Sequence, residues 1–352
     1  MTQAQLASTI SLDQSSLTKI ESGTRRVSAL ELSRIAGALG ERIEWFVSEA
    51  PEAIVSHRNR LDPGAASPEI DRLIENAARN IEFLVSQDSQ LELPEVPQLE
   101  RPNNIDEAER SASEARALLG LGEADPLISA SDRASCLGLL TFSFNLGSDA
   151  ADAASILLAR GAVVLVNGEL HVGRRRLAFA HDLGHCLFAD EYTVDWRVSE
   201  QDNSNAWEGR LDRFARALLL PHAGLETSWN ELRDRGDDLR TAVVKLASTF
   251  RVDMATLARR LLELGHVDAV RASQVRTTRT NRADIVELNL LVHDELSSST
   301  LPRIYEQSVL RLFRNEVVSS ARATDLLFDL WDEEDLPDLP ELPESAIWKF
   351  VS

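Results

Sequence analysis

The stretch LAFAHDLGHCLF, residues 177–188, sets two histidines four positions apart inside an apolar run. The spacing of the apolar residues around the histidines predicts an α-helix. On such a helix His181 and His185 lie on one face about one turn apart, so their imidazole rings can share one ion. For an isolated pair, the alternative is that both histidines are hydrogen-bonded core residues.

A second helix supplies the residues that favour a metal site. A catalytic zinc takes three protein ligands and keeps its fourth position for a water molecule, whose pKa falls to about 7. The candidate third ligand is Glu208, in the amphipathic stretch WEGRLDRFARALLLP, where Glu208 and Asp212 share a face. Asp212 is expected to accept the free ring N–H of a ligating histidine and fix its tautomer. Gly184 is expected to let the histidine helix approach a sheet closely.

These two stretches together resemble the ImmA/IrrE family of metallo-endopeptidases, over about residues 105–270. Members of that family carry a His-Glu-x-x-His helix and a later helix with a third ligand glutamate. The resemblance implies a zincin-like core in which His181, His185 and Glu208 bind Zn²⁺. It also implies a protein substrate or partner of the repressor or antitoxin type, so that cleavage or binding relieves repression.

The sequence departs from the family pattern at the general base, because the position of the usual glutamate is taken by Asp182. In a zincin this carboxylate takes a proton from the zinc-bound water and passes it to the leaving amine. Aspartate is one methylene shorter, which draws its oxygens back by about 1.5 Å. A misplacement on the order of 1 Å can cost about 100-fold in rate. We therefore expect a zinc metallo-endopeptidase of reduced activity, with Asp182 as the base; the alternative is an inactive zincin-fold scaffold in a DNA-binding regulator or toxin–antitoxin component.

Two further groups near this pattern have simpler interpretations. Arg174, Arg175 and Arg176 are most simply a solvated helix start. His222 follows Leu220-Pro221 and could contribute to an oxyanion site. A loop histidine near the C-terminus of a helix is the better interpretation.

The rest of the core is expected to be mainly α with a small antiparallel sheet, an α+β fold. The runs CLGLLTFSFNL and ASILLARGAVVLV are typical of strands, and the Asn167-Gly168 pair before ELHV is a strong signal for a two-residue hairpin. We expect four regions: a helix-turn-helix unit at 1–50, a linker with a helix at 51–104, the zincin-like core at 105–270, and a helical C-terminal region with an acidic, Pro-containing tail at 271–352.

The stretch from Thr2 to Gly40 predicts three short helices, the third with a capping box between Ser28 and Glu31. It resembles the XRE-type helix-turn-helix family, whose second motif helix lies in the major groove. The first helix of that family would precede Thr2, so the unit is expected to be abbreviated. The alternative is a packing or dimerisation module without DNA contact. The resemblance implies DNA contacts from Gln3, Gln14, Ser15, Ser16, Lys19 and Arg25.

Composition limits the partners of the chain. The formal net charge of −20 opposes non-specific attraction to phosphate, so DNA binding would have to be local. No window approaches the run of about 18 apolar residues that spans a bilayer, and the N-terminus lacks the features of a secretory signal. Cys136 and Cys186 do not make a disulfide framework. We therefore expect a cytoplasmic protein without a membrane partner; whether it forms a homodimer stays open.

Overall fold

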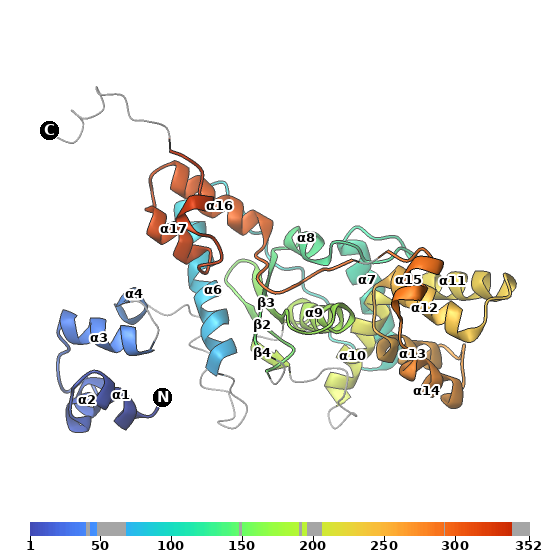
Figure 1. Ribbon diagram of the computed structural model, residues 1–352, viewed down its shortest axis with the longest axis horizontal. Helices are drawn as coiled ribbons and strands as arrows, with labels where there is room; N and C mark the ends of the chain where they lie inside the picture. Colours follow the sequence, from blue (N-terminus) through green and yellow to red (C-terminus); the bar gives the residue numbers. More distant parts are fainter. Residues whose placement is uncertain are drawn as a thin grey trace. The chain divides into compact units, whose positions relative to one another are not determined.

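The computed structural model describes residues 1–39, 43–47, 68–147, 150–189, 192–195, 206–291 and 293–339. Its internal contacts divide the chain into two units, Met1–Pro51 and Glu52–Ser352. Both units are rich in helix, as Figure 1 shows, and the second also contains a small sheet. The predicted α+β class is therefore confirmed.

The first unit contains the short helices α1 (Gln3–Thr9), α2 (Gln14–Glu21), α3 (Ala29–Leu39) and α4 (Ile43–Val47). Side chains close their N-termini: Asp13 accepts from the backbone N–H of Ser16, and the predicted capping box is present, with mutual hydrogen bonds between Ser28 and Glu31. The three helices expected from the sequence are confirmed. The core of the unit is small and consists of Leu6, Ala7, Ile10, Leu17 and Ile35.

The sheet of the second unit contains β1 (Leu139–Phe144), β2 (Ala153–Leu157), β3 (Ala162–Asn167) and β4 (Tyr192–Asp195), in the order β1-β3-β2-β4. Strand β2 is antiparallel to both of its neighbours, but β3 runs parallel to β1. The reason is that β3 folds back from β2 and inserts between β2 and β1. The sheet is therefore mixed, whereas the sequence predicted an antiparallel one.

The predicted hairpin at Asn167-Gly168 is wrong. The segment directly after β3 is a turn and not a strand, and it leads into helix α9 (Val172–Leu187). The buried side chain of Asn167 stabilises this turn. Its Oδ1 accepts from the backbone N–H of Glu169 at 3.1 Å, and its Nδ2 donates to the carbonyl of Gly147 at 2.8 Å. The hairpin lies earlier, between β2 and β3, where Gly161 adopts a φ of 81°.

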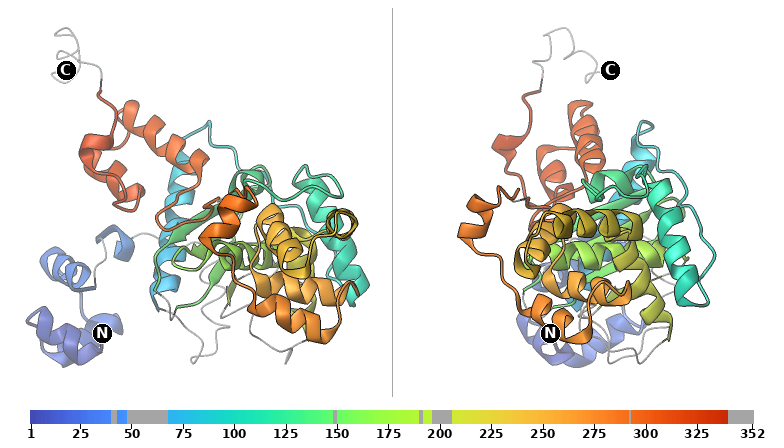
Figure 2. Two further views of the ribbon diagram at one scale, coloured as in Figure 1. Left: turned by 45° about the vertical axis from the view of Figure 1, so that its right-hand side comes forward. Right: turned by 90° about the vertical axis from the view of Figure 1, so that its right-hand side faces the viewer.

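Alternate residues of the strands enter two separate cores. Leu139, Val164 and Val166 face the side of α9, whereas Leu140 and Phe142 face the opposite side. That opposite side is covered by α6 (Pro68–Gln87), α16 (Arg303–Arg314) and α17 (Ser320–Leu326), as Figures 1 and 2 show. The sheet thus forms the middle layer between two groups of helices.

The layer on the α9 side holds most of the remaining helices. Helices α12 (Leu239–Phe250) and α13 (Met254–Glu263) are joined at Arg251, which adopts a left-handed φ of 54° as the C-cap of α12. Within the described residues, no helix is both long and apolar enough to cross a membrane. The remaining elements are α7 (Ile105–Leu118), α8 (Ala130–Ser135), α10 (Ala206–Leu219), α11 (His222–Asp234), α12 (Leu239–Phe250), α13 (Met254–Glu263), α14 (Ala269–Thr277), α15 (Arg282–Glu287) and the 3₁₀ helix η1 (Glu333–Asp335).

The segment that the sequence assigned to a linker, residues 51–104, contributes to this body where it is described. Ile74 and Ile81 of α6 are buried against the sheet, and Leu91 and Leu93 of the following extended loop join the same core. The expected boundaries between the core and its flanking regions remain predictions.

Candidate metal centre

Helix α9, which carries both histidines, is buried on nearly every side. Fourteen of its sixteen residues are buried, all except Val172 and Arg174. A helix that is apolar around most of its circumference is stable only inside a protein, so it must be covered by several elements. Here the sheet lies on one side and α10 on another. The helix therefore presents its polar side chains from a rigid, enclosed position.

The C-terminal end of α9 is held by the extended loop that follows α6. The backbone N–H of Leu99 donates to the carbonyl of Leu187 at 2.7 Å. The Nε of Arg101 donates to the carbonyl of Phe188 at 3.0 Å. Carbonyls in the last turn of a helix have no partner within the helix, so these donors satisfy groups that burial would otherwise leave unpaired.

The N-terminal end of α9 is held by carboxylates. Arg174 pairs with Asp152 at 2.8 Å, and Arg175 and Arg176 form hydrogen-bonded ion pairs with Asp294 and Glu295 respectively. We call residues 293–300 the strap. This segment contacts the start of α9 through Asp294 and Glu295, and it pairs at Thr300 with Ser143 of β1.

The prediction that these arginines form a solvated helix start is wrong. Arg175 is 5% exposed and Arg176 is fully buried. Burial lowers the pKa of Arg176, and the nearby carboxylate of Glu295 opposes that change. Cations at a helix N-terminus also oppose the helix dipole, so acidic partners are needed to keep these side chains charged inside the protein.

Gly184 brings α9 close to α10. A Cβ atom at this position would lie 2.9 Å from Cδ2 of Leu211 and 3.0 Å from Cδ1 of Phe214, both on α10. The sequence analysis expected this glycine to approach a sheet closely, but the close approach is to a helix. It places the first turn of α10, where Glu208 lies, beside the histidines.

Three predicted ligands come together at this contact. The ligand atoms of His181, His185 and Glu208 all lie within 4.8 Å of one another. His181 Nε2 and Glu208 Oε2 are 3.2 Å apart, and the two imidazole centroids are 5.0 Å apart. Two ligand atoms that each lie about 2.1 Å from a tetrahedral zinc are about 3.4 Å from each other. The cluster therefore has the donor types and spacing that could hold one such ion.

The second nitrogen of His181 faces a different carboxylate. Its Nδ1 lies 3.2 Å from Oδ1 of Asp212, which is 14% exposed and lies one turn after Glu208 on α10. The outer partner of a ligating histidine accepts a proton from the ring nitrogen that does not bind the metal, and Asp212 lies near enough to Nδ1 for this role.

An ion-pair network missed by the sequence reasoning continues behind Asp212. Arg216 lies 3.7 Å from Asp212 and 2.9 Å from Glu263 of α13. The spacing of four residues between Asp212 and Arg216 is the one sequence signal that could have indicated it. The Glu263 contact comes from another helix, and local sequence does not reveal it.

The same network ties α10 to α7. Glu109 of α7 pairs with Arg213 of α10 and with Arg260 of α13. Burial acts to raise the pKa of Glu109, but hydrogen bonds from Arg260 and the charges of Arg260 and Arg213 hold it below its ordinary value. The helix that carries Glu208 and Asp212 is thus fixed by charged partners on two neighbouring helices.

The two other residues considered for catalysis differ in placement. Asp182 is fully buried on α9, three residues before His185 and thus next to it on the helix surface. His222 is the first residue of α11 and its side chain is 60% exposed, 3.8 Å from Glu226. His222 thus lies near the C-terminus of α10, which ends at Leu219, as expected, but it is the first residue of a new helix and not a loop residue.

In the first unit, the residues expected to contact DNA fall into two groups. Gln14 and Lys19 are exposed on α2, and Gln14 Nε2 donates to Oε1 of Gln3 at 3.2 Å. The Nε2 of Gln3 donates in turn to Glu21. These side chains form a polar surface along α2.

The second group is engaged within the unit. The hydroxyls of Ser15 and Ser16 donate to the carboxylate of Asp13, and Arg25 pairs with Glu31 at 2.7 Å. The hydrogen bonds from Ser16 and then Ser15 lower the pKa of Asp13. These hydroxyls primarily stabilise the start of α2.

Comparison with known proteins identifies both units. Residues 134–262 match the IrrE N-terminal-like domain, a peptidase family, and residues 1–46 match a helix-turn-helix family. No curated protein and no solved structure matches the chain. The first match spans β1 to α13 and includes the whole His181, His185 and Glu208 cluster. The two families together indicate a protease-like transcription regulator. Residues 134–262 are therefore similar to the ImmA/IrrE family, and residues 1–46 are similar to the XRE-type helix-turn-helix family.

Proposed function

We propose that the second unit is a zinc-dependent endopeptidase whose substrate is a protein of the repressor or antitoxin type, so that its action controls transcription. The observation that supports this most strongly is the ligand cluster itself. His181, His185 and Glu208 bring their donor atoms together, and Asp212 lies behind one imidazole. Metal sites need both the ligands and a partner that orients them.

In this proposal His181 Nε2, one imidazole nitrogen of His185 and a carboxylate oxygen of Glu208 hold the metal. When bound, zinc supplies a Lewis acid and a water molecule acidic enough to attack a peptide carbonyl near neutral pH. The carboxylate of Asp182 would serve as the proton acceptor beside this site, and would return the proton to the amine of the departing peptide. Asp212 keeps the Nδ1 proton of His181 in place throughout.

Metal content is the first measurement. Elemental analysis of the purified chain is expected to give about one zinc per chain, as a three-ligand catalytic site requires. His181→Ala and Glu208→Ala should lose it, whereas His222→Ala, an exposed histidine outside the cluster, should retain it. A wild-type chain that stays free of metal after zinc is supplied would overturn the proposal.

The activity of Asp182 needs a separate experiment. Cleavage of a candidate repressor by the wild-type chain should rise in Asp182→Glu, because the longer side chain restores the reach of the base. It should vanish in Asp182→Asn while zinc is retained. Activity that is absent in the wild type and appears only in Asp182→Glu would favour an inactive scaffold that binds its protein partner.

A DNA-binding role is the second candidate function, favoured by the exposed Gln14 and Lys19 on α2. The protein would then give a salt-dependent footprint on a short inverted repeat, bound as a homodimer. Gln14→Ala and Lys19→Ala should abolish the footprint, and Lys245→Ala, a cation of the second unit, should leave it intact. A footprint that survives both α2 changes would rule out α2 as the recognition helix.

A further inference from the structure

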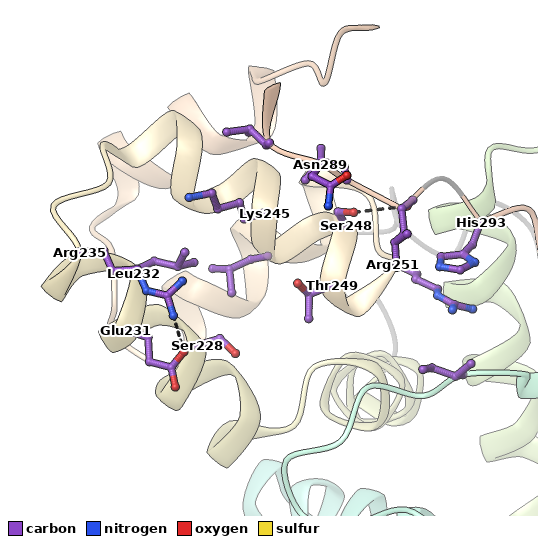
Figure 3. A pocket seen from close by; sticks show the side chains of 15 residues that line it. Ser228, Glu231, Leu232, Arg235, Lys245, Ser248, Thr249, Arg251, Asn289 and His293 are labelled. Atoms are coloured by element: carbon purple, nitrogen blue, oxygen red, sulfur yellow. Dashed lines mark hydrogen bonds and ion pairs between the residues drawn. The ribbon is translucent and has the colours of Figure 1, made fainter. Parts of the chain in front are cut away.

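A pocket lies in the second unit, apart from the metal cluster. None of the residues that line it belongs to that cluster. The pocket has a volume of about 590 Å³. It lies between α11, α12 and the segment of residues 288–291 and 293, as Figure 3 shows. Sites for small molecules usually have volumes of roughly 300–1,000 Å³. The size of this pocket therefore suits a small organic ligand.

The charge of the pocket is opposite to that of the chain. Arg235, Lys245 and Arg251 line it, and Glu231 is the one acidic residue among the lining side chains, although the whole chain has a net charge of −20. Figure 3 shows Arg251 on the opposite side of the cavity from Arg235 and Lys245. Each of these cations also has a carboxylate partner, which for Arg235 is Glu231 at 3.5 Å. The attraction for an anionic ligand therefore depends on the donors that these pairs leave open.

These cations have carboxylate partners but retain donors for a ligand. Arg251 lies 3.6 Å from Glu295, and Lys245 lies 2.6 Å from Asp237. A guanidinium has five N–H donors and an ammonium has three, so one carboxylate partner leaves several of them for another acceptor. The side chains of Arg251 and Lys245 are only 14% and 29% exposed, and partial burial strengthens their attraction for an anion.

Apolar side chains also line the pocket. Leu232 and Leu246 are buried at the pocket, whereas Ile128 and Leu291 line it with 45% and 70% of their surface exposed. Covering exposed apolar surface is favourable by roughly 25 cal/mol for each Å². A ligand with an apolar body would therefore gain from contacts that water does not provide.

We propose that this pocket binds a small amphipathic organic anion, such as an aryl or alkyl carboxylate. The carboxylate would pair with Lys245, and the hydroxyls of Ser248 and Thr249, within one turn of it on α12, would offer further hydrogen bonds. The apolar body would cover Leu291 and Ile128. This binding activity is separate from the peptidase function, because none of the lining residues belongs to the metal cluster.

The test is calorimetric titration of the full-length chain with 4-phenylbutyrate and with its uncharged amide, 4-phenylbutanamide. The carboxylate should bind saturably, and the amide at least about 10-fold more weakly, because hydrogen bonds to charged groups contribute roughly 1.5–3 kcal/mol. Lys245→Gln should weaken carboxylate binding by a similar factor. Arg314→Gln, which removes an exposed cation of α16, should leave it unchanged.

A second pair of variants avoids any effect on folding. Leu291→Glu changes an exposed side chain at the pocket and should repel the carboxylate, whereas Val286→Glu makes the same change at a 75% exposed residue outside the lining. Loss of binding in Leu291→Glu alone would support the proposal. Equal affinity for acid and amide, equal effects of the paired variants, or no saturable binding would overturn it. His181→Ala should bind as the wild type does, so this result is independent of whether the chain is a peptidase.

Discussion

The two ring nitrogens of His181 face different carboxylates, and this difference decides which of them can bind a metal. Nε2 lies 3.2 Å from Glu208 and Nδ1 lies 3.2 Å from Asp212. A neutral imidazole carries one proton, so a proton held towards Asp212 leaves Nε2 as the donor atom. Asp212 thus matters for the proposed site although it is not itself one of the clustered ligands.

Asp212→Asn should therefore weaken zinc binding. Loss of an outer partner of this kind typically lowers metal affinity by roughly 10- to 100-fold. Competition with a chromophoric chelator would measure the change. Asp234→Asn, at the exposed end of α11, is the matched control and should bind zinc as the wild type does. An unchanged affinity in Asp212→Asn would mean that the Nδ1 contact does not orient the ligand.

At this scale, local spacing explains what could be predicted. The pairs His181–His185 and Glu208–Asp212 were identified because residues four apart share a helix face, and the structure brings three of them together as a possible ligand set. The burial of Arg175 and Arg176 was not predictable in this way. Their partners, Asp294 and Glu295, lie 119 residues later in the chain, and no local pattern relates the two segments.

Among the elements, the packing of α9 against α10 sets the width of the proposed site. Gly184 is a point of close approach, and we expect a side chain there to push α10, which carries Glu208, away from α9. This contact was only half anticipated: the glycine was expected to allow close packing, but against the sheet. A single sequence shows that a small residue is present without showing which neighbour it faces.

Gly184→Ala should lower both the unfolding temperature of the second unit and its zinc affinity. Overpacking costs roughly 1–3 kcal/mol, which exceeds the gain of about 1 kcal/mol or less from replacing glycine in a helix. Calorimetry and chelator competition would measure the two effects. Gly37→Ala in α3, where nothing lies within 4 Å, should instead stabilise its own unit. Unaltered stability and affinity in Gly184→Ala would show that α10 can move without consequence.

The attachment of α15 to α12 should depend on pH. Hydrogen bonds from Arg240 lower the pKa of Asp284 to about 2 from the ordinary value of 3.8. Because the folded pKa lies below the unfolded one, this pair stabilises the protein fully above pH 3.8 and loses its effect as the pH falls towards 2. The difference in urea midpoint between the wild type and Asp284→Asn should shrink over that range. A constant difference from pH 5 to pH 2 would contradict this account.

For the molecule as a whole, the residues that match the peptidase family are only part of the second folded unit. Residues 134–262 include the entire sheet and α9, but one face of that sheet is covered by α6, α16 and α17, which lie outside the match. The helices themselves were recognisable from their periodicity. Which face they cover depends on contacts between distant segments, and the sequence pattern does not contain that information.

A fragment of residues 134–262 should therefore fail to fold, whereas a fragment of residues 68–339 should fold and take up zinc. The shorter fragment would expose Leu140, Phe142 and Leu165, which are fully buried in the complete body. Circular dichroism during thermal unfolding would distinguish the two, because only the longer fragment should show a cooperative transition. A cooperative transition in the shorter fragment would show that the outer helices are dispensable.

The strap, finally, links the proposed site to one surface segment, because its carboxylates pair with the arginines at the start of α9. After a backbone break just before Asp294, the carboxylates that pair with Arg175 and Arg176 would be held by noncovalent contacts such as those of Ser143 with Leu296 and Thr300. Loss of these carboxylates would leave two buried cations without compensation. The start of α9 thus depends on a surface segment 119 residues later in the chain.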